Sequence, residues 1–480
     1  MGENHVNPIE MPPDVMLKKS PFLVVRQLRD DEVRVYSKLH GNLTSYGSEI
    51  IDVLGAFDRP VSMGTAAAQV SAMCRCEPSV LMRELYEKRF LVEGDRDERD
   101  MFAEYVAMAR HRNEVARISK VTFLLSAKCN LSCKGCYHSF YDFKSGHMTS
   151  EFADSVLSGL FPYLKKRGIR SLLISFLGYE PLLNFETMRQ VCDRAAAMSE
   201  EYGIDTTFKI FTNAFTLNED VYDWIVKNGP RLSFKVSLDG VREDNDQRRV
   251  DRAGKGTFDR VVGNLKRIIA TGAECDVLTT LSKINFANIE RFVDEMAAIG
   301  IRNITANIFC GQSPEERRIE LSEEERFEAI KRMDLATEKH GIEFDGEWKF
   351  AVVQMITGAH FTCPAGMRQM VFCADGAIHP CQRFAGTELT FGVFGDDFWE
   401  KLGEGQCEGY ERWIADLYDG VMDRVKEEHA DLTGWSCPFV PFIRGECLGK
   451  HVEKDFNERL IEYYVTRPMD RIIAKSRIHC

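Results

Sequence analysis

Residues 126–140 read SAKCNLSCKGCYHSF and place Cys129, Cys133 and Cys136 in a C-x3-C-x2-C array. The array follows an apolar run, VTFLLS at 121–126, whose composition predicts a buried strand. Three thiols on one short loop cannot pair among themselves without leaving one over, so their spacing favours metal ligands over disulfides. The fold prediction therefore starts from a strand that ends at three thiols.

This strand is the first of six that alternate with amphipathic stretches. The later strands are predicted at SLLISFLG, TTFKIFTN, LSFKVSLDG, CDVLTTLS and NITANIF, and stretches such as SEFADSVLSGLFPYLKKRG separate them. Alternation of this kind predicts an α/β fold, here a partial (β/α)6 barrel. Ligands bind at the C-terminal ends of such strands, so we expect the three thiols at the mouth of the barrel.

Composition limits the class of protein. The chain has 480 residues, is 44% apolar and 28% charged, and carries a formal net charge of −12, which weighs against a nucleic-acid partner. It has no run of about 18 apolar residues, so no membrane-spanning helix is expected. The chain has fifteen cysteines, and its N-terminus lacks the features of a signal peptide. Together these observations imply a reducing, cytoplasmic location.

The rest of the chain divides by pattern. Two β-rich runs within 22–41, three helical patterns and a strand-like FLVE at 90–93 predict a winged-helix-like domain. From about residue 342 the pattern is irregular and rich in cysteine. The predicted organisation is a polar tail at 1–20, the winged-helix-like domain at 20–97, a linker helix at 98–117, the partial barrel at 118–310, a bridging helical segment at 311–360 and an irregular iron–sulfur domain at 361–480.

The three thiols suit one kind of cluster particularly well. Three thiolates can hold three irons of a [4Fe–4S] cube, because each iron takes one cysteine. The fourth iron then keeps an open position, as catalytic metal sites do. The amino and carboxylate groups of S-adenosylmethionine would fill that position, and one electron would release a 5′-deoxyadenosyl radical. The alternatives are a zinc site completed by His138 or a distant cysteine, and three unrelated buried thiols.

Motifs at successive strand ends resemble those of the radical S-adenosylmethionine superfamily. LGYEPLLN resembles its Gly-Gly-Glu-Pro motif, with Tyr179 in place of the second glycine. FTNAFTLN resembles its Thr-Asn-Gly stretch, with Ala214 in place of glycine, and VSLDGVREDNDQRR resembles its Ser-Leu-Asp-Gly run followed by arginine. The resemblance implies a cofactor site formed by Tyr137, Gly178, Tyr179, Glu180, Thr212, Asn213, Ser237 and Arg249.

The resemblance also implies roles for these residues. Tyr137 would lie beside the adenine, and Gly178 would let the backbone approach the cofactor closely. Glu180 would accept from the ammonium group of the cofactor, and Ser237 would face its polar groups. Arg249, with Arg248 as the alternate, would pair with its carboxylate.

The C-terminal segment resembles the SPASM extension, which carries auxiliary iron–sulfur clusters. CPAGMRQMVFCADGAIHPC fits its first signature, with a hairpin turn at ADG, whereas GWSCPFVPFIRGEC has Gly434 and Ile443 where the second signature has cysteines. The resemblance implies one auxiliary [4Fe–4S] cluster on Cys363, Cys381 and Cys447, with Cys310 or Cys437 as the fourth ligand. Cys373 and Cys407 are alternative ligands of a second cluster, and buried free thiols are expected at Cys74, Cys76, Cys192 and Cys275.

The N-terminal order of elements resembles the RiPP recognition element, a module that binds leader peptides by adding them as a strand to its sheet. The rival is DNA binding, but the predicted helix PSVLMRELYEKRF mixes acidic and basic residues and is no basic recognition helix. Together the resemblances imply a maturase that oxidatively modifies a ribosomally made precursor peptide, by a thioether or carbon–carbon crosslink, with a flavodoxin or ferredoxin as reductant. The alternatives are a peptide epimerase, an anaerobic sulfatase-maturase-type formylglycine-forming enzyme and a metal-regulated winged-helix DNA-binding protein.

Overall fold

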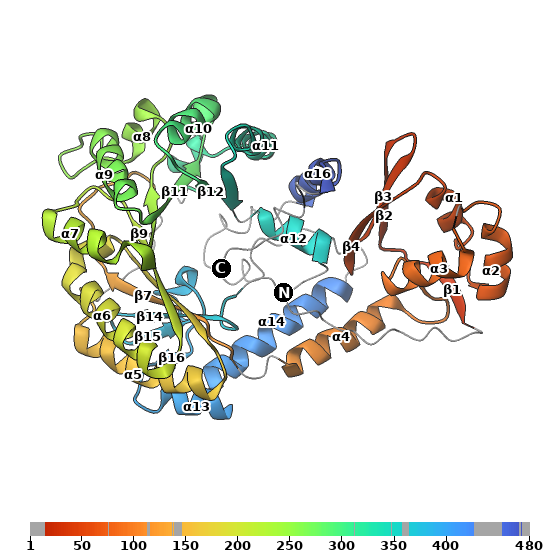
Figure 1. Cartoon of the computed structure of the whole chain (residues 1–480), viewed down its shortest axis with the longest axis horizontal. Coiled ribbons are helices and arrows are strands. Elements are labelled where there is room, and N and C mark those ends of the chain that lie inside the picture. Colours follow the sequence, from red (N-terminus) through yellow and green to blue (C-terminus); the bar gives the residue numbers. More distant parts are fainter. Residues whose placement is uncertain are drawn as a thin grey trace.

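The structure is a computed structural model that describes residues 15–74, 76–112, 116–136, 138, 146–311, 313–346, 348–357, 364–426, 454–469 and 472. A curved ten-stranded sheet has the strand order β13-β12-β11-β10-β9-β8-β7-β14-β15-β16. Neighbours from β13 to β14 are parallel, and β15 and β16 continue the sheet in antiparallel pairing. Figure 1 shows helices around the outer side of this sheet and its concave side turned toward the centre of the molecule.

Six of the parallel strands confirm the predicted ones. They are β7 (Lys120–Ser126), β8 (Ser171–Gly178), β9 (Asp205–Thr212), β10 (Leu232–Ser237), β11 (Glu274–Leu281) and β12 (Asn303–Ile308). The helices between them are α5 (Ser150–Lys166), α6 (Phe185–Tyr202), α7 (Glu219–Asn228), α8 (Arg242–Arg248), α9 (Phe258–Ala270) and α10 (Ile289–Ala298). The predicted α/β fold with a mostly parallel sheet is therefore confirmed.

Two parallel strands extend the sheet beyond the predicted six. β13 (Glu343–Gly346) pairs with β12, and β14 (Gln369–Cys373) pairs with β7 from far along the chain. β14 turns into β15 (Ala377–His379) at the predicted ADG hairpin, where Gly376 has φ +86°. The small strand β16 (Gly392–Val393) closes this edge.

The segment after residue 342 is less irregular than predicted. Besides the helix α11 (Glu323–Lys339) of the bridging segment, the described residues form α12 (Lys349–Thr357), α13 (Phe398–Glu404), α14 (Glu408–Lys426) and α16 (Lys454–Val465). Buried apolar residues account for these helices, because Phe398, Trp399 and Leu402 of α13 and Trp413 of α14 belong to the main hydrophobic core. Phe391 and Tyr410 are buried in the same cluster.

Alternation along the strands separates an apolar outer face from a polar concave face. On β10, Phe234 and Val236 lie in the same buried cluster as Val261 of the outer helix α9. Successive strand residues point to opposite faces, so Lys235 and Ser237 face the concave side. The barrel therefore has a polar interior beneath the strand ends.

The N-terminal part has its own hydrophobic core, separate from that of the barrel. One sheet contains β2 (Leu23–Arg29), β3 (Glu32–Ser37) and β4 (Gly41–Tyr46), and a second contains β1 (Met16–Lys19), β5 (Val61–Ser62) and β6 (Leu91–Glu93). The predicted helices are present as α1 (Ile50–Gly55), α2 (Met63–Val70) and α3 (Pro78–Glu87), and the linker helix is α4 (Glu98–Arg112). The winged-helix assignment itself stays a prediction.

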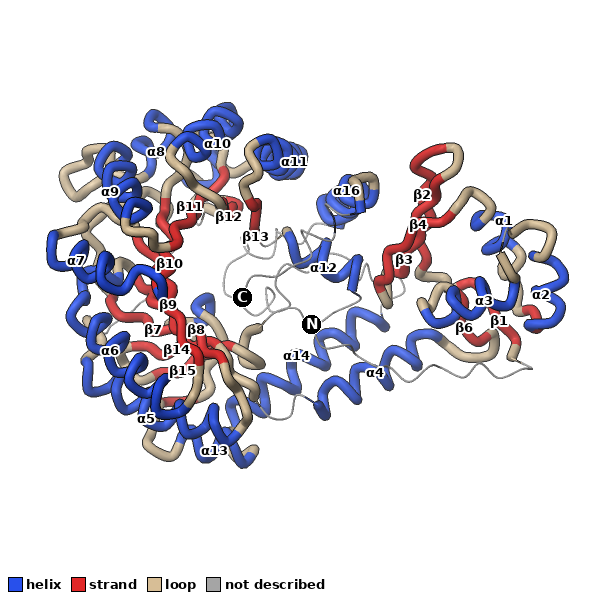
Figure 2. The backbone as a smooth tube through the Cα atoms, in the orientation of Figure 1, coloured by secondary structure: helices blue, strands red, loops and turns tan. Residues whose placement is uncertain are grey.

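A buried arginine joins this N-terminal part to the barrel. Arg34 of β3 donates from Nη1 to the carbonyl oxygens of Val465 and, at 2.5 Å, Arg467, at the end of α16. The helix α12 packs on β4 and on α16, and α16 packs on α11. Figure 2 shows α12 and α16 between the sheet of β2–β4 and the β13 edge of the barrel. In the part of the chain that the structure describes, no helix has the length and apolar character needed to cross a membrane.

Candidate active site

The three thiols lie on a loop that is held from a distant part of the chain. Cys129, Cys133 and Cys136 are all partly exposed. The loop backbone pairs with the segment after α8, because the amides of Ser132 and Lys134 donate to the carbonyl oxygens of residues 250 and 248, each at 2.9 Å. The ends of β7 and β10 are thereby brought to one mouth of the barrel, as predicted from strand order.

One thiol already has hydrogen-bond donors aimed at its sulfur. Cys129 Sγ accepts from the backbone amide of Leu131 at 3.4 Å and from Asn213 Nδ2 at 3.6 Å. Such N–H···S contacts tune the potential of iron–sulfur clusters. Burial raises the pKa of Cys129 to about 11, so metal binding would displace the proton.

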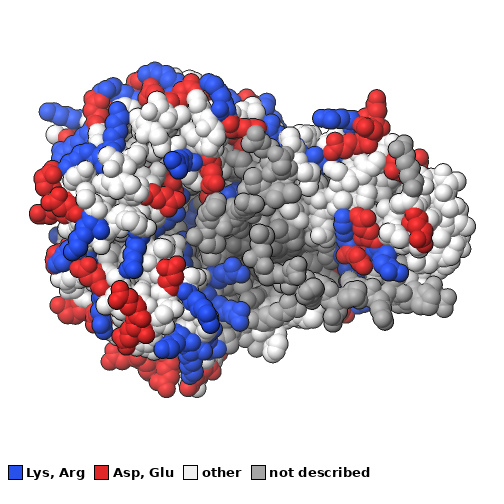
Figure 3. All heavy atoms as spheres, viewed as in Figure 1, with Lys and Arg blue, Asp and Glu red and all other residues white. Residues whose placement is uncertain are grey.

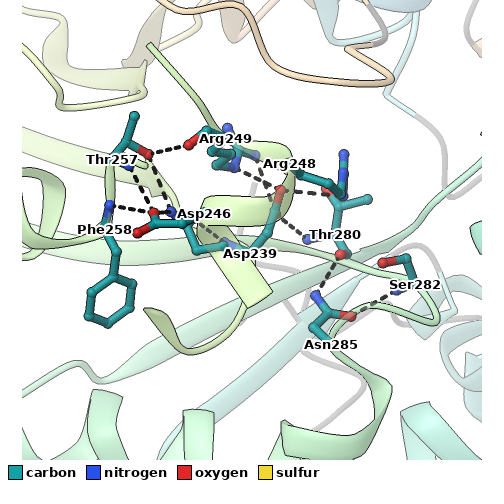
Figure 4. Close-up of polar contacts among 10 residues, drawn as sticks. Asp239, Asp246, Arg248, Arg249, Thr257, Phe258, Thr280, Ser282 and Asn285 are labelled. Atoms are coloured by element: carbon teal, nitrogen blue, oxygen red, sulfur yellow. Dashed lines mark hydrogen bonds and ion pairs between the residues drawn. The ribbon is translucent and has the colours of Figure 1, made fainter. Parts of the chain in front are cut away.

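A buried carboxylate gathers two arginines at the end of β10 (Figure 4). Asp239 Oδ2 accepts from Arg249 Nε at 2.7 Å and lies 3.3 Å from Arg248 Nη1. Its Oδ1 accepts from Arg249 Nη2 at 3.3 Å and from the amide of Thr280 at 2.8 Å. Burial alone would raise the pKa of Asp239, but the two guanidinium groups hold it below its ordinary value.

These arginines also act on the thiols. Burial raises the pKa of Cys133, and the positive charge of Arg249 opposes that rise. Arg248 is buried and packs over the ring of Phe309 at 4.5 Å from the centroid. The site offers three thiols as soft donors, N–H groups directed at the Cys129 sulfur and arginines beside the loop. These features fit an anionic [4Fe–4S] cluster held by three cysteines. The predicted contact of Arg249 with a cofactor carboxylate stays a prediction, since its guanidinium lies on Asp239.

The Gly178–Tyr179 step is crowded by the neighbouring strand. Gly178 has φ +128°, and a Cβ there would lie 2.6 Å from Ser126 O. Tyr179 stacks on the ring of His138 with centroids 4.8 Å apart and donates to the His138 carbonyl oxygen at 2.9 Å. The close contact with Ser126 therefore requires glycine at position 178, and Tyr179 holds His138, two residues after the third cysteine.

Glu180 is a buried tie between β8 and β9. Its Oε1 accepts from Thr212 Oγ1 at 2.7 Å and from the amide of Leu182 at 3.1 Å, and its Oε2 accepts from the amide of Asn213 at 2.8 Å. Burial raises its pKa to about 7 although these hydrogen bonds favour the carboxylate. The next residue after Asn213, Ala214, has φ +52°, a conformation that suits the glycine of the resembled motif. The predicted ammonium contact of Glu180 stays a prediction.

The other predicted residues have mixed outcomes. Ser237 ends β10 on the concave side, and Cys373, Cys381 and Cys407 are buried. Cys310 is disulfide-bonded in this structure, so its thiol must be reduced before it can bind iron. Tyr137, Cys363, Cys437 and Cys447 lie outside the described residues.

Of the four cysteines expected to be buried, Cys192 and Cys275 are, whereas Cys74 is half-buried and Cys76 is exposed. That expectation was wrong for Cys76, which lies in the loop between α2 and α3, whereas Cys74 still packs partly against the N-terminal core. Among the described residues, no three His, Cys, Asp or Glu side chains are grouped to hold a single metal ion.

Sequence reasoning missed two residues of this site. Asp239 stands inside the quoted Ser-Leu-Asp-Gly run but received no role. Asn130, inside the thiol loop, accepts from Asn213 Nδ2 at 2.8 Å and donates to Thr216 at 2.9 Å. A carboxylate followed by adjacent arginines was the available signal for the first, whereas nothing in the spacing pointed to the second.

Comparison with known families agrees with this geometry. Residues 123–296 match the Radical SAM superfamily, a range that contains the thiol loop, Glu180 and the Asp239 cluster. The similarity to that superfamily therefore lies in the predicted barrel segment.

Curated relatives cover only part of this chain. The radical SAM cyclopropyl synthase TigE of Paramaledivibacter caminithermalis is 24% identical over 232 residues, 44% of this chain and 48% of that protein. A cysteine-type anaerobic sulfatase-maturating enzyme of Clostridium novyi is 27% identical over 175 residues, 36% of this chain and 44% of that protein. The chain thus spans about half the length of these relatives.

Among solved structures, native anSMEcpe with bound AdoMet aligns with a TM-score of 0.58. It shares 16% sequence identity, and the alignment covers 75% of this chain and 99% of that one. At this identity the likeness shows a shared fold.

Gly178→Ala is expected to destabilise the fold by about 2 kcal/mol or more, because the new Cβ meets Ser126 O in a backbone conformation that alanine avoids. Denaturant unfolding of the purified chain measures this. Gly263→Ala is the matched control, since a Cβ there meets nothing within 4 Å inside α9, and it should stabilise by about 0.5–1 kcal/mol. Equal effects of the two substitutions would contradict the crowding.

Glu180 gives a pH dependence with a defined sign. Its folded pKa of about 7 lies above the ordinary value of 4.5, so the folded state binds more protons between these values and stability falls as pH rises through that window. The loss attributable to this carboxyl is roughly 3 kcal/mol. Unfolding free energies of wild type and Glu180→Gln at pH 5, 6 and 7 (roughly spanning the window) test it. A difference between the two proteins that stays constant with pH would refute it.

Asp239→Asn is expected to destabilise by about 3–5 kcal/mol, because the buried Arg248 and the mostly buried Arg249 lose their counter-charge. Asp259→Asn removes the partner of Arg242 in an exposed ion pair and should change stability by less than about 1 kcal/mol. Calorimetric or denaturant unfolding separates the two. Similar losses of unfolding free energy in both variants would show that the buried Asp239 cluster contributes no more to stability than an exposed ion pair does.

Proposed function

We propose that this chain is a radical S-adenosylmethionine enzyme that oxidatively modifies a ribosomally made precursor peptide, most simply by forming a thioether or carbon–carbon crosslink. The observation that carries the proposal is the thiol loop at the mouth of the parallel barrel, with Asn213 donating to Cys129 and Arg249 beside Cys133. A reduced cluster with S-adenosylmethionine supplies a 5′-deoxyadenosyl radical. The chain's own part is to hold both groups over the polar interior of the barrel.

Several residues are proposed for the cofactor. The residues that would line the cofactor are Tyr137, Gly178, Tyr179, Thr212, Asn213 and Ser237. Arg249 would bind its carboxylate. The mouth supports this, because Glu180 fixes Thr212 and Asn213 beside the thiol loop. The backbone at Gly178 and Tyr179 lies against the end of β7, where that loop begins.

The peptide half of the proposal rests on the N-terminal part. Its sheet of β2, β3 and β4 has two edge strands, and an edge strand can accept an extended peptide as a further strand. On the neighbouring helix α3, Lys88 pairs with Glu84 at 2.8 Å, which leaves little net positive charge for a nucleic acid. Figure 3 likewise shows acidic and basic side chains interspersed over one face of the molecule. Peptide binding is favoured over DNA binding on these grounds.

The auxiliary cluster and the partners complete the proposal. Cys381 follows β15 and Cys310 follows β12, and with Cys363, Cys437 and Cys447 they form the pool of proposed ligands for at least one auxiliary [4Fe–4S] cluster. That cluster would accept the electron released by the peptide. A flavodoxin or ferredoxin would reduce the first cluster, and the cytoplasm would keep the thiols reduced.

A second candidate is formylglycine formation on a protein cysteine or serine. The similarity to a sulfatase-maturating enzyme favours it, whereas the N-terminal sheet is unnecessary for it. Peptide epimerisation is the third candidate and needs a hydrogen donor that the described site does not identify.

The test is anaerobic reconstitution with iron and sulfide, followed by incubation with S-adenosylmethionine, a reductant and the precursor peptide. We expect 5′-deoxyadenosine and loss of a pair of hydrogen atoms from the peptide by mass spectrometry. The matched control is the Cys129→Ala, Cys133→Ala, Cys136→Ala variant, which should lose both products. Uptake of solvent deuterium without that mass loss would instead support epimerisation, and no 5′-deoxyadenosine from wild type would refute the radical reaction.

A further inference from the structure

Lys235 is a buried cation inside the barrel that the proposed cofactor site does not use. It lies between Phe234 and Val236, which face the outer helices, so its side chain projects from the concave face of β10. Only 8% of the residue is exposed. Ser237, the proposed cofactor contact, follows on the same face at the strand end. Lys235 therefore lies one layer of side chains beneath the mouth.

The side chain of Lys235 crosses one strand to reach its hydrogen-bond partner. Nζ donates to Thr305 Oγ1 of β12 at 2.6 Å, passing over β11. On β11, Asp276 stands directly opposite Lys235 in the strand register and is itself buried. Asp345 of β13, which pairs with Lys349 at 3.5 Å, adds a second negative charge. A lysine and an aspartate thus share one low-dielectric stretch of the interior.

The charges around Lys235 come from every side of the barrel interior. Lys209 on β9 and Lys120 on β7 repel it, and Asp276 and Asp345 attract it. Burial, with Lys209 second, lowers the pKa of Lys235 to about 8. Burial also raises the pKa of Asp276, and the negative charges of Glu274 and Glu343 raise it further. Both shifts favour the uncharged forms, and a group that titrates near the working pH is suited to accept a proton.

We propose that Lys235, which lies opposite Asp276 in the strand register, accepts the proton released when the bound peptide is oxidised, an inference that rests on the proposed function. In that reaction a peptide C–H bond gives its hydrogen atom to the 5′-deoxyadenosyl radical. Closing the crosslink breaks a second X–H bond of the peptide, forms the C–X bond and releases one electron and one proton. The electron passes to an iron–sulfur cluster of the auxiliary class, and the proton passes to Lys235 Nζ.

Two neighbouring substitutions should shift the pH dependence in opposite directions. Crosslinking by wild type should rise with pH through about 8, as Lys235 loses its proton. Asp276→Asn removes an attracting anion, so the midpoint should move to lower pH. Lys209→Gln removes a repelling cation, so the midpoint should move to higher pH. Midpoints that do not move, or that move together, would overturn the inference, because a merely structural role predicts no such opposition.

Substitution of Lys235 itself separates proton transfer from radical formation. Lys235→Met should lower crosslinking by about 100-fold or more while 5′-deoxyadenosine still forms. Lys235→Arg, which keeps the charge but cannot give up its proton, should fail equally and guards against a folding defect of the methionine variant. Crosslinking by either variant at the wild-type rate would overturn the inference. Absence of 5′-deoxyadenosine from wild type would instead overturn the proposed function.

A measurement without cluster or cofactor tests the same residue. The rate at which acetic anhydride labels Lys235, followed by mass spectrometry of the purified chain, reports the protonation of its amine. A midpoint near 8 that falls in Asp276→Asn and rises in Lys209→Gln is expected. A midpoint near that of the exposed Lys401 in every variant would contradict the proposal.

Discussion

The buried ion cluster of Asp239 with Arg248 and Arg249 is the interaction on which the mouth of the barrel depends. It forms at the end of the fourth strand of the barrel, and its segment pairs through the backbone with the thiol loop after the first strand. Burying two guanidinium groups is costly unless a carboxylate meets them with good geometry. Because Asp239 does so, the same arginines can lie close to three thiols without being expelled into water.

A second tie works in the same way across neighbouring strands. The buried carboxylate of Glu180 gathers the hydroxyl of Thr212 and the amide of Asn213, and Asn213 then turns its side chain to Cys129. Each carboxylate follows one strand and binds a residue of the next: Glu180 binds Thr212 of β9, and Asp239 binds Thr280 of β11. The mouth is thus a set of polar contacts between strand ends, resting on an apolar shell between the sheet and its helices.

The N-terminal part and the barrel meet at the side where the sheet has a free edge. Arg34 reaches the end of α16, and α12 follows directly from the edge strand β13. The helices α12 and α16 therefore link the N-terminal sheet, where a peptide is proposed to bind, to the β13 edge of the barrel. The concave interior of the barrel carries the charged residues Lys235, Asp276 and Asp345.

The sequence by itself determined the strand and helix alternation, because short apolar runs such as SLLISFLG, separated by amphipathic stretches, are typical of buried parallel strands. It also determined where the thiols lie, since parallel strands all end at one mouth. The short strand β13 escaped prediction, and so did the pairing of β14, the first arm of the predicted hairpin, with the distant strand β7. Side-chain partners escaped as well. Only the tertiary structure decided three contacts: Glu180 with Thr212, Asp239 with both arginines, and Lys235 with Thr305. These contacts join different strands and loops, and no local sequence pattern encodes the distances between them.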